Sequence, residues 1–191
     1  MAKKETRTTK YGIRKTDDGR RSLIEVRFAR PISGISATWV RNIVAETLKL
    51  ECSSDSVSVY VTGNREIRRI NRRFLKHDYA TDVISFPLER RMGEIVVSAE
   101  TARQTSEELG IPFREELARY LIHGTLHLLG YKDEKPADKK HMHKRQEALL
   151  KRVIASPAGA KQSRFNKIAL SPPQSADGPA EVLMARLCPS Q

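Results

Sequence analysis

The segment that most constrains the fold is the end of a predicted helix over 113–129, where large apolar residues surround two histidines. These apolar residues are Leu121, Ile122, Leu126, Leu128 and Leu129. A helix end that is apolar on most sides must be covered by other elements, so we expect a central helix. The helical period places His123 and His127 one turn apart on the same face. Two buried imidazoles without partners would be costly, whereas a bound metal ion would satisfy both.

A third metal ligand is predicted just beyond the helix. Gly130 follows His127 by three residues and can end the helix with a sharp turn. That turn would bring Asp133 back over the helix end as an oxygen ligand. Three protein ligands leave one position of a tetrahedral zinc ion open to water, which is typical of catalytic rather than structural zinc. Imidazole combined with carboxylate favours zinc over magnesium. The residues therefore predict one zinc ion held by His123, His127 and Asp133.

The histidine spacing is similar to that of the zinc-protease motif His-Glu-x-x-His-x-x-Gly-x-x-His. In that motif the glutamate takes a proton from the metal-bound water. Here Gly124 follows the first histidine, so a peptidase is disfavoured. Glu116 and Tyr120 lie on the same helix stripe as His123 and are candidates for orienting its ring. A purely structural role of this pair stays equally open.

Hydrophobic periodicity predicts strands and helices in alternation through the middle of the chain. The strands are expected at 22–30, 57–62, 82–86 and 94–97, with Pro87 and Gly93 separating the last two. The helices are expected within 33–49, where Ser36 would be the N-cap, and over 64–74, 99–109, 113–129 and 137–154. This pattern predicts a single α+β domain over 22–154, with helices packed around four strands.

The two ends of the chain differ from this domain in composition. Residues 1–21 lack apolar periodicity and carry a net charge of +5, so we expect a flexible basic arm. Residues 155–191 hold five of the nine prolines, which predicts a disordered tail. No apolar run reaches the roughly 18 residues of a membrane span, and no secretory signal is expected. Cys52 and Cys188 are too far apart in the sequence to suggest a disulfide framework, which favours a reducing cytoplasm.

The basic charge of the chain points to a polyanionic partner. The formal net charge is +12, and +5 of it lies on residues 22–154. A basic surface attracts nucleic acid, although it would also suit a surface that only confers solubility. One face of the predicted helix at 64–74 carries Arg65, Arg68, Arg69, Arg72 and Arg73. As a cluster these residues favour polyanion binding, because arginine makes bidentate contacts with phosphate.

Several blocks of sequence form one distinctive pattern. The block around the histidines reads His123-Gly-x-Leu-His127-Leu-x-Gly130-Tyr131. Upstream lie Asn71-Arg-Arg-Phe and Asp78-Tyr-Ala-Thr-Asp-Val-Ile-Ser-Phe-Pro87, then Gly93-Glu-Ile-Val-Val97, and downstream lie Met142 and Glu147. Together these blocks resemble the YbeY family of bacterial metal-dependent endoribonucleases, over residues 23 to about 152 and in the family's order. It implies a mixed four-stranded sheet flanked by helices, with the zinc site in a cleft at the end of the central helix.

The resemblance also implies a function. It points to a cytoplasmic, single-strand-specific endoribonuclease that matures the 3′ end of small-subunit ribosomal RNA and acts in ribosome quality control. Single-stranded RNA, small-subunit ribosomal RNA and the ribosome are the implied partners, and no membrane is involved. The alternative is a non-catalytic ribosome assembly factor, stabilised by zinc, whose basic face binds ribosomal RNA. A three-ligand site argues against this alternative, because structural zinc usually has four protein ligands.

Two positions depart from the family pattern. The usual third ligand of the family is a histidine, and here that position is Asp133, with His141 and His143 as possible substitutes that we expect on the surface. The family commonly has an arginine, proposed to act at the phosphate, where this chain has Leu75. The basic residues next to it are candidates for RNA contact in its place: Arg72, Arg73 and Lys76. No side chain is identified as general base, and water and the ribose 2′-hydroxyl both stay open as nucleophile.

Overall fold

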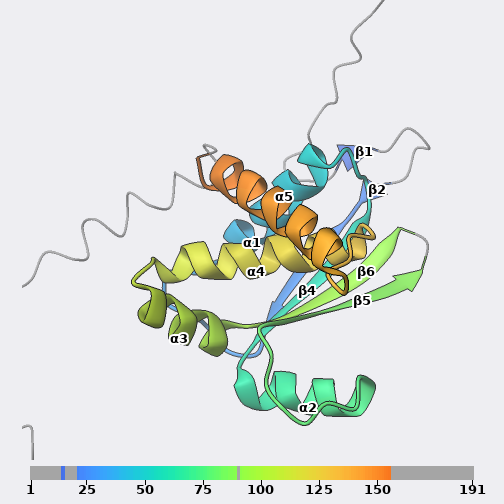
Figure 1. The fold of residues 1–191 in the computed structure, drawn as a ribbon. Coiled ribbons are helices and arrows are strands. Elements are labelled where there is room, and N and C mark those ends of the chain that lie inside the picture. Colours follow the sequence, from blue (N-terminus) through green and yellow to red (C-terminus); the bar gives the residue numbers. More distant parts are fainter. Residues whose placement is uncertain (1–13, 16–20, 90, 156–191) are drawn as a thin grey trace, which may run out of the picture.

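A mixed four-stranded sheet supports the fold in the computed structural model, which describes residues 14–15, 21–89 and 91–155 (Figure 1). The strands lie in the order β3 (Ile24–Phe28), β4 (Ser56–Thr62), β6 (Met92–Ser98) and β5 (Val83–Glu89). Strands β3, β4 and β6 run parallel, and β5 pairs antiparallel with β6 at one edge. A separate antiparallel pair joins β1 (Arg14–Lys15) to β2 (Arg21–Ser22).

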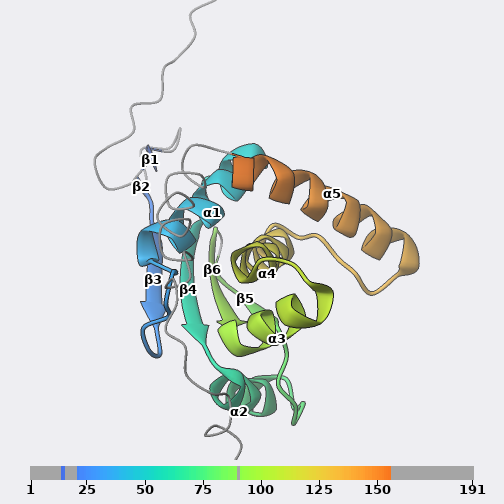
Figure 2. The same cartoon turned by 90° about the vertical axis from the view of Figure 1, so that its left-hand side faces the viewer.

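The helices of the described residues lie on both sides of this sheet. One face carries α1 (Ala37–Leu50) and α4 (Phe113–Leu128), and α3 (Ala99–Leu109) packs beside α4. The last helix, α5 (Pro136–Ala155), packs on α4 and α1, so α4 lies between the sheet and α5 (Figure 2). The opposite face carries α2 (Asn64–Phe74). The predicted α+β class, the four-stranded sheet and the central helix are therefore confirmed.

The central helix α4 is covered on almost every side, as its apolar sequence predicts. Leu117, Leu121, Ile122 and Leu126 are fully buried. Gly124 lets the helix approach the sheet, because a Cβ atom there would lie 3.0 Å from both Ile95 Cγ2 and Val83 Cγ2. The Ser85 hydroxyl on β5 donates a hydrogen bond of 2.9 Å to the Gly124 carbonyl oxygen. This close contact fixes the C-terminal half of α4, and with it both histidines, against β5 and β6.

A second, smaller core attaches α2 to the other face of the sheet. It consists of Ile67 from α2 with Ile84 and Val96 from the sheet, and Ile70 and Phe86 pack against it. Ile67 and Asn71 are the buried residues of α2. The helix has the predicted bounds, and its five predicted surface arginines are all exposed.

The predicted boundary between the last two strands is wrong. Pro87 lies within β5 and Gly93 within β6 rather than between the two strands. Proline is tolerated in β5 because that strand is at the sheet edge, and the pairing register shifts between Pro87 and Glu89. Gly93 lies under α4, since a Cβ atom there would be 2.6 Å from Leu128 Cδ2. The first strand is also shorter than the predicted 22–30, because β3 covers only Ile24–Phe28.

Most of the two predicted terminal segments lies outside the described residues. Of the arm at 1–21 the structure describes only Arg14, Lys15 and Arg21, and of the tail at 155–191 only Ala155, the end of α5. Cys188 is likewise outside the described range, and Cys52 is exposed. Within that range no helix combines the length and apolar character needed to cross a membrane.

The attachment of α2 can be tested through its one fully buried side chain. Ile67→Ala is expected to lower the free energy of unfolding by about 2–5 kcal/mol, because it leaves a cavity in a small core that cannot easily rearrange. Leu109→Ala is the control, since Leu109 is 62% exposed and its loss should change stability by less than about 0.5 kcal/mol. Urea unfolding measures both variants. Equal stability of the two would show that Ile67 does not hold α2 on the sheet.

Candidate metal centre

The turn after α4 has the geometry that the sequence predicts. Gly130 adopts a left-handed conformation with φ +90°, and its N–H donates to the His127 carbonyl at 3.0 Å. The Tyr131 N–H donates to the Leu126 carbonyl at 3.1 Å. These two bonds form a Schellman motif, which ends the helix and reverses the chain direction. The reversal carries Asp133 back to the two histidines.

The structure brings His123, His127 and Asp133 together. The two Nε2 atoms are 3.0 Å apart. Asp133 Oδ2 lies 3.9 Å from Nε2 of His123 and 3.7 Å from Nε2 of His127. One ligand atom from each residue lies within 4.8 Å of the others, and among the described residues no other group of histidine, cysteine or carboxylate side chains does this. All three side chains are partly exposed and so can be reached from outside.

Hydrogen bonds fix which nitrogen of each ring faces this group. His127 Nδ1 donates to the Tyr131 carbonyl at 3.1 Å, and His123 Nδ1 donates to Gln146 Oε1 at 2.8 Å. The Gln146 amide is oriented by its own N–H, which donates to Glu147 at 3.1 Å. Since both hydrogens are on Nδ1, both Nε2 atoms present lone pairs to one another. Burial, together with the neighbouring His123, lowers the pKa of His127 and favours its neutral, metal-binding form.

The donor set fits a divalent metal ion. Two lone pairs facing each other at 3.0 Å repel, and a cation bound to both removes that repulsion. Tetrahedral zinc with bonds of 2.0–2.1 Å places two nitrogen ligands about 3.3 Å apart, close to the separation seen here. Asp133 supplies a third, anionic donor within reach. Two imidazoles and one carboxylate suit zinc and other first-row transition metals better than magnesium.

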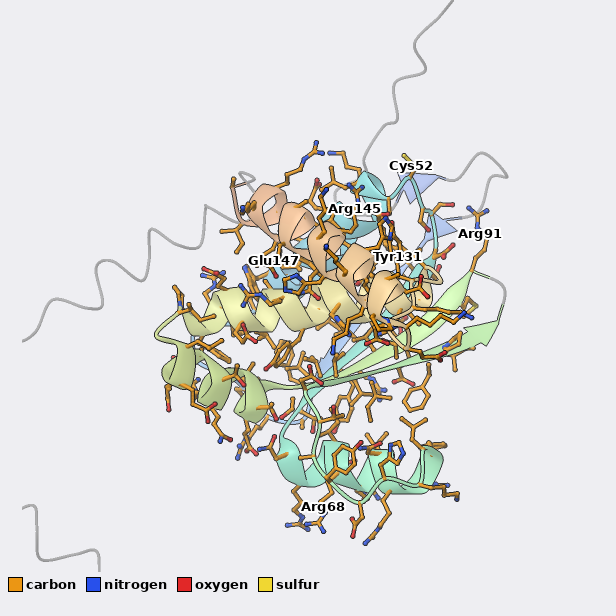
Figure 3. The ribbon with its side chains drawn as sticks, in the orientation of Figure 1. Cys52, Arg68, Arg91, Tyr131, Arg145 and Glu147 are labelled. Atoms are coloured by element: carbon orange, nitrogen blue, oxygen red, sulfur yellow. The ribbon has the colours of Figure 1, made fainter. Side chains whose placement is uncertain are left out.

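Gln146 is a site residue that the sequence analysis missed. It orients His123, and it is held in turn by Glu147, which accepts a hydrogen bond of 3.0 Å from Arg119. Figure 3 shows Glu147 where α5 meets α4. Burial alone would raise the pKa of Glu147, but the hydrogen bonds from Gln146 and Arg119 lower it overall and keep the carboxylate charged. One sequence signal could have identified Gln146: it is the polar residue between Met142 and Leu149 on the buried face of α5.

Neither of the two residues suggested for orienting His123 has that role in the structure. The Glu116 carboxylate is buried and pairs with Arg119. The Tyr120 hydroxyl donates to Thr105 at 3.0 Å, and burial raises the pKa of Tyr120 to about 12. Tyr120 does line the same cavity as His123. The spacing of Tyr120 and His123 therefore predicted correctly that they lie on the same side of α4. The hydrogen-bond partner of His123, however, is Gln146 of α5.

The support for His127 comes from the loop that follows α4. The Tyr131 hydroxyl donates to Glu51 at 2.9 Å, and Arg145 donates to the other oxygen of Glu51 at 2.6 Å. These contacts tie the loop to the end of α1 and to α5. Tyr131 and Arg145 are labelled in Figure 3. The Tyr131 carbonyl that accepts from His127 is held in place by this arrangement.

The two alternative histidine ligands are on the surface, as predicted. His141 and His143 are both exposed on α5. The ring of His141 stacks on Tyr131, with centroids 5.8 Å apart and an angle of 10° between the planes. His143 lines a cavity with His123, but it does not belong to the close group of three.

Two cavities adjoin the three residues. One, of about 200 Å³, lies between α4 and α5 and is lined by His123, Asp133 and Asp82, among others. The other, of about 380 Å³, is called the α2 groove here and is bounded by the end of α2, the loop at 75–81, β5 and His127. The three residues of the candidate centre therefore lie where the two cavities approach each other. This arrangement leaves a bound ion open to substrate from both sides.

The predicted RNA-contacting residues lie at the C-terminal end of α2, beside the groove but not on its walls. Arg72, Arg73 and Lys76 are all exposed. Arg72 lies 3.9 Å from Asp78, Arg73 lies over the Phe74 ring at 5.3 Å, and Lys76 donates to the Arg73 carbonyl at 3.3 Å. Two basic residues in the last turn also complement the negative end of the helix dipole.

Comparisons with known proteins identify the family of this chain. The family described as endoribonuclease YbeY matches residues 31–154. The chain belongs to the YbeY family. An endoribonuclease YbeY from Salinibacter ruber is 30% identical over 148 residues, which cover 71% of this chain and 94% of that protein. One from Myxococcus xanthus is 40% identical over 130 residues, covering 63% of this chain and 43% of that protein.

A solved structure supports the fold assignment of this YbeY family member. The solution structure of TM1509 from Thermotoga maritima superposes with a TM-score of 0.56 at 26% identity, covering 81% of this chain and all of that one. The chain spans less than two thirds of some curated YbeY relatives, with 43% of the Myxococcus protein and 56% of one from Rhodopirellula baltica. The predicted family is thus confirmed.

Metal content provides a direct test of the three-residue centre. Untagged wild-type protein is expected to hold close to one zinc ion per chain, and Asp133→Ala is expected to lose zinc on dialysis. The loss of affinity should exceed the 10–100-fold that removal of a supporting residue alone costs. Elemental analysis by mass spectrometry gives the ratio. Asp133→His, which replaces the carboxylate with a nitrogen donor, should retain zinc. Wild-type zinc content in Asp133→Ala would mean that another residue is the third ligand.

Proposed function

We propose that this protein is a metal-dependent endoribonuclease that cleaves single-stranded RNA during ribosomal RNA processing. The observation that carries this proposal is the group of His123, His127 and Asp133, with two ring nitrogens directed at each other beside two open cavities. Membership of the YbeY family supports an RNA substrate, because the relatives are described as endoribonucleases.

Zinc is the proposed metal, with one ion per chain. Two imidazoles and a carboxylate are a common donor set of catalytic zinc. A divalent ion held there would supply a Lewis acid at the phosphate to be cleaved. The residues of the chain supply the rest of the arrangement: Gln146 and the Tyr131 carbonyl hold the two rings, so the ligands need little reorganisation when the metal binds.

The basic residues at the end of α2 are proposed to position the RNA backbone. Arg72, Arg73 and Lys76 lie beside the α2 groove, which leads to His127. Contacts of this kind carry register and affinity rather than sequence preference. A single strand suits these cavities, because its bases can be splayed out and placed separately, whereas those of a duplex remain stacked and paired.

Two other functions are less well supported. A peptidase of that kind would need a carboxylate at position 124, but the chain has glycine there, and a Cβ atom would already press on Ile95 and Val83 at 3.0 Å. A non-catalytic assembly factor with structural zinc would be expected to offer four protein ligands, and the described residues offer three. The endoribonuclease proposal therefore remains the better one.

The setting proposed for this activity is the 3′ end of small-subunit ribosomal RNA, on the ribosome in the cytoplasm, with a role in ribosome quality control. It is supported by the family's link to RNA cleavage and by the formal net charge of +12, which favours association with a large polyanion. Cosedimentation with isolated ribosomal subunits measures this association. We expect binding at physiological ionic strength and much weaker binding at about 0.5 M salt, roughly threefold higher, because salt screens contacts with phosphate.

Cleavage by a metal-site variant tests the proposed activity. His123→Ala is expected to reduce cleavage of a single-stranded RNA oligonucleotide to background, because the ion loses a ligand, while RNA affinity stays within about twofold since phosphate contacts are made elsewhere. A gel assay with end-labelled RNA measures the first quantity, and fluorescence anisotropy the second. His141→Ala is the control and should cleave like the wild type. Full cleavage by His123→Ala would rule out a catalytic metal at this site.

A further inference from the structure

The loop at 75–81 presents two stacked rings in the α2 groove. The rings of His77 and Tyr79 have centroids 5.5 Å apart and are nearly parallel, with an angle of 12° between their planes. The Tyr79 hydroxyl and His77 Nδ1 are 3.5 Å apart. Both residues line the groove that His127 also lines. Tyr79 is 57% exposed, so much of its apolar ring is left in contact with solvent.

This loop is held in place by α2. The Asn71 side-chain amide donates to the Tyr79 carbonyl at 3.0 Å, and Asn71 is itself buried. Asp78 accepts two hydrogen bonds from Arg68, at 2.9 and 3.2 Å. The hydrogen bonds from Arg68 lower the pKa of Asp78, which keeps this contact charged. The rings therefore project from a loop that is already ordered, and a ligand would lose little free energy in fixing them.

The surroundings of the rings combine apolar and basic character. Leu75 lines the groove and is 45% exposed, and Pro87 also lines it. Arg72, Arg73 and Lys76 lie on the adjoining surface. Aromatic rings that stack on bases, next to cations that follow the backbone, are the usual combination in proteins that bind single-stranded nucleic acid. An apolar platform beside basic side chains fits a nucleobase and its phosphate better than it fits a purely apolar partner.

We propose that the His77–Tyr79 pair is a stacking platform for one base of the RNA, in the part of the strand next to the phosphate at the metal centre. This inference rests on the proposed function, and it adds a base-binding subsite to it. Because His127 lines the same groove, a base on the platform lies on the α2 side of the centre. Stacking of this kind accepts any base, so the subsite confers affinity for an unpaired nucleotide with little sequence preference.

The affinity of single-stranded RNA tests this subsite. The probe is a 12-nucleotide, fluorescein-labelled 2′-O-methyl RNA of mixed sequence, with wild-type protein loaded with zinc. Tyr79→Ala is expected to weaken binding roughly 5- to 150-fold, the range for loss of one base stack. Tyr79→Phe keeps the ring and should bind within about twofold of the wild type. Leu109→Ala, which removes an exposed apolar side chain from α3, is the control and should not change affinity. Zinc content and melting temperature confirm that each variant is intact.

A probe of the same length and backbone without any bases separates stacking from a general disturbance of the loop. We expect removal of the bases to weaken binding to the wild type more than binding to Tyr79→Ala, because only the wild type has the complete platform. Unchanged affinity of Tyr79→Ala for the probe with bases, or an equal loss for the two proteins when the bases are removed, would overturn the inference while leaving the proposed function in place. Tighter binding of an aromatic peptide than of RNA would also overturn it. If wild-type protein neither binds nor cleaves single-stranded RNA, the proposed function is wrong, and the stacking platform is wrong with it.

Discussion

Burial of α4 between the sheet and α5 is the constraint on which the rest of the structure depends. The helix lies close to β5 and β6 at Gly124, where a Cβ atom would press on Ile95 and Val83, and the contact is fixed by the hydrogen bond from Ser85. This packing leaves His123 and His127 on the one flank of the helix end that is not covered by apolar residues. Their Nδ1 atoms are bonded to oxygen acceptors, so their Nε2 atoms need a partner that accepts lone pairs. A metal ion would be such a partner, and the same packing positions the three residues that could bind it.

Each ligand of the candidate centre is supported by a different part of the fold. His123 depends on Gln146 in α5, and His127 depends on the loop that Glu51 and Arg145 hold through Tyr131. Asp133 depends on the left-handed turn at Gly130. The sheet thus contributes no ligand to the candidate centre. It fixes α4, which carries both histidines and leads into the turn to Asp133. The α2 groove has a separate attachment, through Ile67 and the small core on the opposite face.

Local sequence signals were sufficient for the parts of the site that are close together in the chain. The spacing of His123 and His127, the glycine at position 130 and the bounds of α2 follow from helix period and capping, and the structure agrees with all of them. The partner of His123 could not be predicted in this way, because Gln146 reaches it only through the packing of α5 on α4. Pro87 was misleading for a related reason, since its tolerance depends on β5 being an edge strand.

The stacked pair in the α2 groove shows the same limit. His77 and Tyr79 lie in a loop without periodicity, and their alignment depends on Asn71 and Arg68, which hold the loop against α2. Leu75 departs from the family's arginine in sequence, and the structure shows where it lies, on a wall of the groove. The position therefore adds apolar surface to the groove beside the two rings.

Anomalous X-ray diffraction at the zinc edge, from crystals of untagged protein grown with zinc, would locate the metal ion. We expect one strong anomalous peak within about 2.0–2.2 Å of Nε2 of His123, Nε2 of His127 and a carboxylate oxygen of Asp133. We also expect that no fourth protein side chain binds that ion. A peak centred on His141 or His143, a fourth protein ligand, or no peak near the three residues would contradict a catalytic metal centre at the end of α4.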